Sequence, residues 1–441
     1  MDINIRKFFN ACNPSRTLVT SNPEDKQYYI DFSEVRGGPV INQLARAILM
    51  AEGTETCQLF TGHIGCGKST ELHELERKLQ DSGFHVAYCD SMKDLGEGDV
   101  EISDILLSIT HQVSQSLEDI GIKVKSGGLE GLFKEISDFL GSPVEFEYEN
   151  KFSLPYGLGQ ITAKTKNDVK LRGRLQSFLD SKVGTIIDSI NQEILTVANT
   201  NLQKEGYQGL VVIVDNLEKM SAMNRTMKMS QPEYIFIDRG NELRRLRSHL
   251  VYTVPLSLTF SRRFQELVNN FGGGVPPVTL PMVPVQMKNG SPCAQGLKLL
   301  RRMVLRRAFP NVQMPEEDAE LIAKAFDSPE TLDRLCCISG GHVRTLMGLL
   351  YGCLKAADPP LTLSCVERVI LEHRDSLARA LETSEWELLK QVAQQQDLSG
   401  AAGHDTLLRS LFVFEYRSDQ GRWFGLNPAL KELEIYKSWQ L

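Results

Sequence analysis

The stretch Gly62–Thr70, GHIGCGKST, decides the fold of this chain. It fits the pattern G-x-x-x-x-G-K-[ST] at every fixed position. Such a loop wraps a phosphate group with backbone N–H groups, and its glycines permit the positive φ angles and the close approach that this needs. The residues expected to line the phosphates are Gly62, His63, Ile64, Gly65, Cys66, Gly67, Lys68, Ser69 and Thr70.

The loop has the flanks that this motif requires. The short apolar run Cys57–Gly62 ends in glycine and predicts a buried strand, and Lys68–Ser82 has the spacing of a helix. The N-terminal N–H groups and the positive dipole end of that helix would point at the same phosphates. Lys68 would reach the β- and γ-phosphates, and the Ser69 hydroxyl would coordinate Mg²⁺. We therefore expect ATP as the ligand and Mg²⁺ as the cofactor.

An acidic residue ends the most apolar run of the chain. Leu210–Asp215, LVVIVD, has the composition of a buried parallel strand. Asp215 is the candidate Mg²⁺ ligand, with a helix cap as the alternative. Many ATPases place a glutamate directly after this aspartate, but here the position is Asn216, which puts the rate of hydrolysis in doubt. Glu218 is the candidate base that polarises water; the alternative is an exposed helix acid paired with Lys219.

Alternating strands and helices predict a parallel α/β fold for about the first 290 residues, with further strands at Phe84–Asp90, His249–Pro255 and Val278–Gln286. Beyond residue 290 the chain is expected to form a series of helices. Near the C-terminus two further helices precede a β-hairpin, which is the layout of a winged helix. The expected domains are an N-terminal segment at 1–50, a P-loop NTPase α/β domain at 51–290 with an irregular insertion at about 141–165, an all-helical lid at 291–375 and a winged-helix domain at 376–441.

Composition excludes several classes of protein. The chain of 441 residues carries a formal net charge of −7, which argues against broad binding to nucleic acid or to anionic membranes. Its nine cysteines include no C-x-x-C pair, so we expect reduced thiols in a cytoplasmic protein. There is no secretory signal and no apolar run of the ~20 residues that would span a bilayer, so no membrane association is expected.

In this order the motifs resemble the AAA+/STAND group of P-loop ATPases, near the origin-recognition type. GHIGCGKST is followed by VVIVDNLEKM, by the strand HLVYTVP and by SGGHVR at Ser339–Arg344, before the lid and the winged helix. The DNLE pattern is similar to the acid-x-x-acid arrangement of NACHT and KAP ATPases. The resemblance covers roughly residues 25–441 and implies hydrolysis of the β–γ phosphoanhydride bond of ATP.

The resemblance also implies roles for two further residues. In such ATPases a polar residue at the end of the strand after the acidic one senses the γ-phosphate, and Thr253 holds that position; a plain strand-end threonine is the alternative. An arginine early in a lid helix also reaches the γ-phosphate. Arg344 matches it, with an exposed helix arginine as the alternative. The implied catalytic set is Lys68, Asp215, Glu218, Thr253 and Arg344.

Two function hypotheses stay open. The first is an ATP-driven molecular switch that controls assembly, as a homo-oligomer or through a protein partner carrying the effector activity; by analogy only, such proteins serve in bacterial signalling or phage defence. The second is a DNA-associated ATPase of the initiator or loader kind, or a nucleotide-binding scaffold with little hydrolysis. The expected reading helix of the winged domain carries one arginine and its wing two, which favours a protein contact over DNA.

A cluster of arginines carries a further open alternative. Arg301, Arg302, Arg306 and Arg307 lie on one expected helix. Such a basic face would either supply an arginine finger to a neighbour's ATP or be a solvated, salt-bridged surface.

Overall fold

The computed structural model describes most of the chain. The described residues are 2–95, 100–122, 131, 134–136, 138–139, 147–148, 151–152, 154–166, 168–220, 224–226, 229–310, 312, 319–398 and 403–439. They form two compact units. The sheet unit comprises Ile41–Thr61 and Leu75–Val278, and the loop unit comprises Met1–Val40, Gly62–Glu74 and Thr279–Leu441.

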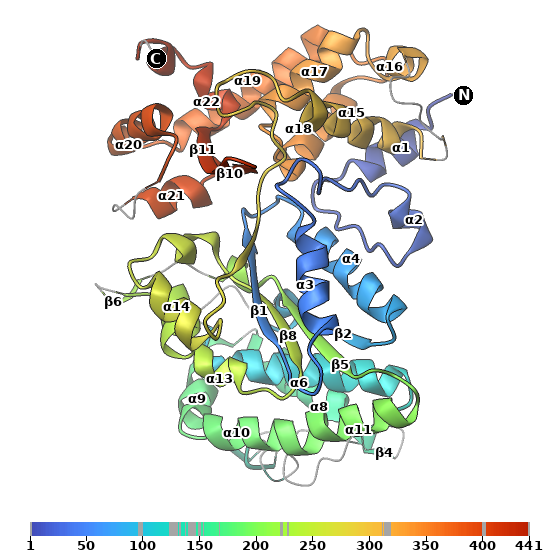
Figure 1. Cartoon of the computed structure of the whole chain (residues 1–441), viewed down its shortest axis with the longest axis vertical. Helices are drawn as coiled ribbons and strands as arrows, with labels where there is room; N and C mark the ends of the chain where they lie inside the picture. The colour runs from blue at the N-terminus through green and yellow to red at the C-terminus, as the bar shows by residue number, and fades with distance from the viewer. Residues whose placement is uncertain are drawn as a thin grey trace. The chain divides into compact units, whose positions relative to one another are not determined.

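A five-stranded sheet in the order β2-β5-β8-β1-β9 forms the centre of the α/β fold (Figure 1). Its strands are β1 (Cys57–Gly62), β2 (His85–Asp90), β5 (Leu210–Asp215), β8 (His249–Thr253) and β9 (Val278–Leu280). The pairs β2–β5, β5–β8 and β1–β8 are parallel. The predicted parallel α/β core is therefore confirmed. Because parallel strands end at the same edge of a sheet, the carboxyl ends of β2, β5 and β8 meet there.

The apolar composition of β5 follows from its place in the sheet. The strand lies between β2 and β8, and all six of its residues are buried. Leu210, Val212 and Val214 belong to the apolar core of the sheet unit, together with residues of α6 (Ile102–Asp119) and η1 (Ile190–Leu195). A strand covered on both faces needs apolar side chains throughout rather than an alternating pattern.

Helices surround this sheet. Those of the sheet unit are α3 (Val40–Leu49), α5 (Ser91–Asp94), α6, α8 (Leu154–Lys166), α9 (Val169–Asp180), α10 (Val183–Ser189), η1, α11 (Thr196–Lys204), η2 (Leu217–Lys219), α12 (Gln231–Glu233), η3 (Tyr234–Asp238), α13 (Gly240–Arg244), η4 (Leu256–Phe260) and α14 (Phe264–Asn270). Helix α4 (Lys68–Asp81) continues from the loop into this unit. Short hairpins pair β3 (Glu147–Tyr148) with β4 (Lys151–Phe152), and β6 (Asn224–Thr226) with β7 (Met229–Ser230).

The insertion expected to be irregular at about 141–165 contains a helix. Residues 141–146, 149–150 and 153 lie outside the described residues, but α8 begins at Leu154. Leu158 and Ile161 on this helix are each 1% exposed and pack into the core with α6. Their i, i+3 spacing puts both on one face, and the glycines and proline near them concealed this pattern in the sequence.

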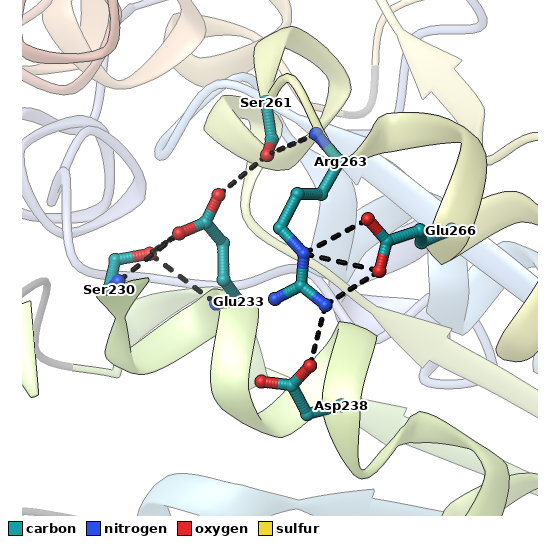
Figure 2. A network of polar contacts seen from close by, with 6 residues as sticks. All are labelled: Ser230, Glu233, Asp238, Ser261, Arg263 and Glu266. Atoms are coloured by element: carbon teal, nitrogen blue, oxygen red, sulfur yellow. Dashed lines mark hydrogen bonds and ion pairs between the residues drawn. The ribbon is translucent and has the colours of Figure 1, made fainter. Parts of the chain in front are cut away.

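A network of polar contacts joins η3 to the segment that follows β8 (Figure 2). The guanidinium of Arg263 pairs with Asp238 at 2.6 Å and with Glu266 at 2.7 Å. The Ser261 hydroxyl donates to Glu233 at 2.6 Å and accepts the N–H of Arg263. Two carboxylates on one arginine fix the start of α14 against η3 more firmly than a single exposed ion pair would.

The loop unit contains two short N-terminal helices and the helices of two C-terminal regions, which correspond to the expected lid and winged helix. They are α1 (Ile5–Ala11), α2 (Pro23–Lys26), α15 (Ala294–Ala308), α16 (Ala319–Ala325), α17 (Pro329–Ile338), α18 (Val343–Ala356), α19 (Leu363–Arg379), α20 (Thr383–Gln395), α21 (His404–Arg409), α22 (Pro428–Lys431) and α23 (Glu434–Lys437). The N-terminal helix α1 packs on α15 through Phe8, which is fully buried with Leu300 and Val304.

The winged-helix layout is present at the end of the chain. Helices α20 and α21 precede the antiparallel hairpin of β10 (Val413–Ser418) and β11 (Gly421–Leu426). The aromatic rings of Tyr416 and Trp423 stack across this hairpin with centroids 4.4 Å apart. No helix within the described ranges is long and apolar enough to cross a bilayer.

Candidate functional site

Three glycines shape the loop between β1 and α4. Gly62, Gly65 and Gly67 have φ angles of 156°, 87° and 107°. A Cβ on Gly62 would lie 2.7 Å from the Leu280 carbonyl oxygen, and one on Gly65 would lie 2.7 Å from His342 Nε2. A Cβ on Gly67 would meet nothing within 4 Å. Backbone conformation therefore requires all three glycines, and close packing additionally requires two of them.

Lys68 closes the loop on itself. Its ammonium donates to the carbonyl oxygens of Gly62 and His63, each at 3.0 Å. The side chain is 4% exposed, so a buried positive charge lies inside the turn. An anion that reached this ammonium would gain from a desolvated, charge-assisted interaction.

The next two carbonyls of the loop bind the start of helix α18. The Ile64 carbonyl accepts from His342 Nε2 at 2.8 Å, and the Gly65 carbonyl accepts the N–H of Arg344 at 3.1 Å. His342 Nδ1 then accepts from the Thr345 hydroxyl at 2.7 Å. Burial lowers the pKa of His342 to about 4, so the ring is neutral at pH 7 and keeps this donor and acceptor arrangement.

The Cys66 carbonyl binds the N-terminal segment. It accepts from Arg36 Nη2 at 2.8 Å, and the Arg36 guanidinium also lies 3.6 Å from the Glu71 carboxylate on α4. Tyr29 donates its hydroxyl to Glu71 at 3.1 Å. Burial raises the pKa of Glu71 to about 6, although Arg36 and Tyr29 oppose the shift. The N-terminal segment thus contacts the loop through Arg36 and helix α4 through Tyr29.

Together these contacts turn five consecutive carbonyl oxygens, those of residues 62–66, toward protein donors. Within the part of the chain that the structure describes, the N–H groups of Ile64, Gly65 and Gly67 donate no hydrogen bond. Backbone N–H groups without a protein acceptor in a glycine-rich turn are the groups that bind anions in nests of this kind.

His63 connects the loop to the winged helix. Its Nε2 accepts the backbone N–H of Glu415 on β10 at 2.9 Å, and its ring lies edge-on to Phe414 with centroids 5.9 Å apart. Burial, with smaller contributions from His342 and Lys68, lowers the pKa of His63 to about 3, so the ring stays neutral. The carbonyl of Glu415 accepts the N–H of Met282 at 2.9 Å, which holds β10 in place.

The two phosphate-sensing candidates differ in their surroundings. Arg344 is exposed, and no hydrogen bond or ion pair of its guanidinium occurs among the described residues. Thr253 is fully buried; its hydroxyl donates to the Val214 carbonyl at 3.4 Å and accepts the N–H of Leu217 at 3.1 Å. Arg344 is therefore available to a ligand, whereas Thr253 holds the backbone that follows β5.

Each carboxylate oxygen of Asp215 accepts a hydrogen bond. Oδ1 accepts the N–H of Asn216 at 2.7 Å, and Oδ2 accepts the hydroxyl of Tyr88 at 2.7 Å. Asn216 has a left-handed backbone with φ of 67°, and its side-chain amide donates to Asp90 at 2.8 Å.

Glu218 lies in η2 and is 8% exposed. The exposed helix acid named as its alternative is thus not what the structure contains. Glu218 follows Asp215 by three residues and stays the predicted base for water.

Ser69 and Asp215, the predicted ligands of Mg²⁺, both offer hard oxygen atoms. Among the residues that the structure describes, no group of three or more His, Cys, Asp or Glu side chains is placed to hold a metal ion. Mg²⁺ that arrives with phosphate oxygens needs only one or two hard oxygen ligands from the protein. A serine hydroxyl and an oriented carboxylate, at Ser69 and Asp215, are ligands of that kind.

The expected basic face on α15 is only partly exposed. Arg301 forms an ion pair with Asp333, and Arg306 donates to the carbonyl of Val312 at 3.1 Å. Arg307 is 5% exposed and donates to the carbonyl of Met303 at 2.9 Å. The alternative of a solvated or salt-bridged face fits Arg301, which is ion-paired, and Arg302, which is exposed, whereas Arg307 is buried in the loop unit.

Sequence reasoning missed three residues beside the candidate site. Tyr88 lies on a predicted strand, and its place two residues before the strand's end is the signal that could have found it. Arg36 lies in the N-terminal segment, and its contact with Cys66 joins residues 30 positions apart. Glu415 had no signal, because its contact with His63 joins residues 352 positions apart and is made by its backbone.

Comparisons with known proteins show similarity of structure alone. No family model matches the chain, and no curated protein matches it. Similar solved structures include the ORC1 protein of Aeropyrum pernix in complex with DNA, at 13% identity and a TM-score of 0.37, covering 97% of this chain and 98% of that one. The ORC2 protein of Aeropyrum pernix, in complexes with ADPNP and ADP, is 12% identical with a TM-score of 0.41, covering 90% and 91%.

A Walker-type ATPase of Pyrococcus abyssi is 10% identical with a TM-score of 0.42, covering 98% of this chain and 100% of that one. The chain thus resembles these proteins along nearly its whole length. Values this low transfer no residue role and no activity.

Proposed function

We propose that this chain binds and hydrolyses ATP with Mg²⁺ and uses the nucleotide to change the state of its lid and winged helix. The observation that supports this most is the set of contacts on the phosphate loop. His342 and Arg344 at the start of α18 and Glu415 on β10 all bind loop residues directly. A ligand that reshapes the loop must alter the partners of both C-terminal regions.

The proposed roles follow from the donors and charges present. The N–H groups of residues 62–69 and the ammonium of Lys68 would hold the phosphates. On binding, this ammonium would replace its hydrogen bonds to the carbonyls of Gly62 and His63 with hydrogen bonds to phosphate oxygens. Ser69 and Asp215 are the proposed ligands of Mg²⁺, and Glu218 the proposed base for water. Arg344 is the proposed γ-phosphate sensor, since its guanidinium is exposed beside Gly65. Thr253 is proposed to keep the end of β5 in position for these groups.

Coupling between nucleotide and winged helix is the property to test. Hydrogen exchange of β10 should differ between protein with ATP and protein with ADP, because a ligand shifts an equilibrium only through differential affinity for its states. His63→Ala should remove that difference at β10 while leaving ATP binding measurable by calorimetry. Lys68→Ala is the matched control, because it should abolish binding and the exchange difference together. Unchanged exchange of β10 on saturation of the wild-type protein with either nucleotide would exclude the switch.

A second candidate is the DNA-associated ATPase. Arg417 and Arg422 lie directly opposite each other on the β10–β11 hairpin, and both are exposed. Like charges in such a pair repel, so an anionic partner would stabilise them. Affinity for duplex DNA that falls steeply with salt and is lost in Arg417→Ala/Arg422→Ala would support this candidate, and salt-insensitive or absent binding would remove it.

A further inference from the structure

Tyr88 and Asp215 meet because of the register of two parallel strands. β2 pairs with β5 so that Tyr88 lies beside Ile213 and Asp90 beside Asp215. Side chains two residues apart on a strand share a face, so Tyr88 and Asp215 project to the same side of the sheet. The tyrosine hydroxyl reaches Asp215 Oδ2 at 2.7 Å.

The direction of this hydrogen bond follows from the chemistry of the two groups. A phenol carries a proton and an ionised carboxylate carries none, so the Tyr88 hydroxyl donates and Asp215 Oδ2 accepts. The other oxygen of Asp215 accepts the N–H of Asn216, whose left-handed backbone is fixed by its own side-chain contact with Asp90. Two donors on two oxygens leave the carboxylate plane little freedom to rotate.

We propose that Tyr88 is a positioning residue that orients Asp215 for the metal that accompanies ATP. The inference rests on the proposed function, since it concerns the same carboxylate. A carboxylate that binds Mg²⁺ uses lone pairs in defined directions, and outer partners that fix those directions typically change metal affinity or activity by ~10–100-fold when removed. Tyr88 touches neither nucleotide nor metal in this scheme and acts only through Asp215.

The neighbouring strand offers a matched control. Tyr252 on β8 is fully buried, and its hydroxyl donates to the backbone carbonyl of Leu243 at 3.1 Å. Tyr88→Phe and Tyr252→Phe thus each remove one hydroxyl and its hydrogen bond from a strand of the same sheet. Only the first touches Asp215. A general effect on folding would appear in both variants.

The test uses Mn²⁺ as a spectroscopic probe in place of Mg²⁺. Electron paramagnetic resonance gives the Kd of Mn²⁺ for the full-length protein saturated with a non-hydrolysable ATP analogue, and steady-state assays give kcat and KM. We expect Tyr88→Phe to raise this Kd by about 10–100-fold and to lower kcat, with KM for ATP within about twofold of wild type. Tyr252→Phe should leave all three values unchanged.

A double-mutant cycle separates action through Asp215 from any other role. If Tyr88 acts only on that carboxylate, Tyr88→Phe should add no further loss of Mn²⁺ affinity in an Asp215→Asn background. Wild-type Mn²⁺ affinity in Tyr88→Phe would overturn the role of Tyr88 and leave the proposed function standing. An equal loss of Mn²⁺ affinity in Tyr252→Phe would have the same consequence. A wild-type protein that binds neither the ATP analogue nor nucleotide-dependent Mn²⁺ would overturn the proposed function together with this role.

Discussion

The phosphate loop and the acidic ends of β2 and β5 are held in place by different kinds of neighbour. Loop residues bind Arg36, His342, Arg344 and Glu415, which come from three separate segments of the chain. Asp215, in contrast, is held by the next residue and by the adjacent strand.

The two kinds of neighbour suit two different tasks, which are holding a carboxylate in place and transmitting the state of the loop. Strand ends in a parallel sheet are fixed by the hydrogen-bond register, and the Tyr88 hydroxyl and the Asn216 N–H restrict the orientation of the Asp215 carboxylate. A loop bonded to a lid helix and a hairpin can report its state to them, because its contacts can be exchanged one by one. Substitutions in the loop should therefore affect coupling and binding, and substitutions at the strand ends should affect chemistry.

Lys68→Ala should have the largest effect. Two charge-assisted hydrogen bonds to phosphate oxygens, each worth about 1.5–3 kcal/mol, correspond to about a 10²–10⁴-fold loss of ATP affinity, and turnover would be lost with it. Calorimetry with Mg-ATP measures this. Lys78→Ala, on the same helix α4, is the control and should bind ATP as wild type. Equal affinity in Lys68→Ala and wild type would refute the site.

At the strand ends, Glu218→Gln should lower kcat by about 10²–10⁴-fold and leave ATP affinity unchanged, because only the base is removed. Asp215→Asn should instead raise the Mg²⁺ concentration needed for half-maximal turnover. Steady-state kinetics over a Mg²⁺ series distinguishes the two variants. Turnover at the wild-type rate in Glu218→Gln would mean that another group positions the water.

Arg344→Ala tests whether a residue bound to the loop senses the γ-phosphate. A guanidinium that contacts only the γ-phosphate contributes about 1.5–3 kcal/mol to ATP binding, so ATP affinity should fall about tenfold to hundredfold. ADP affinity should not change. Arg368→Ala, an exposed arginine on α19, is the control. Equal losses for both nucleotides, or none, would show that Arg344 is not the sensor.

Glu415→Gln should have the smallest effect, and its size depends on pH. Burial raises the pKa of the Glu415 carboxyl from 4.5 to about 7, against the lowering effect of Arg422 and Arg417. Between these values the folded state holds a proton that the unfolded state lacks, so this group's contribution to stability falls as pH rises from 4.5 to 7. The contribution totals at most about 3 kcal/mol, and burial of the glutamine amide offsets part of the gain.

Glu415→Gln should accordingly be more stable than wild type by about 1 kcal/mol at pH 8, with little difference near pH 4.5. Denaturant unfolding at both pH values measures this. Glu387→Gln, an exposed position on α20, should show no such pH dependence. A variant that is less stable than wild type at pH 8 would mean that the Glu415 carboxylate is stabilised by a contact that burial does not outweigh.

Much of the fold could be predicted because its signals are local. The continuous apolar run of β5, the glycines before Lys68 and the order of two helices and a hairpin near the C-terminus each depend on residues close in sequence. The helix α8 was missed because glycine and proline obscured the spacing of Leu158 and Ile161. The face of α15 that buries Arg307 could not be inferred, since basic residues on one helix look alike until a partner covers one side.

The sequence by itself determined the backbone of this loop and its charge, since its three positive φ angles fall on glycines and Lys68 is the charged residue within it. Tertiary structure decided what holds the loop carbonyls and what orients Asp215. Tyr88 is separated from Asp215 by 127 residues, and His63 from Glu415 by 352. Strand register and domain packing, which depend on the whole core, bring such pairs within hydrogen-bond distance, and no local pattern records them.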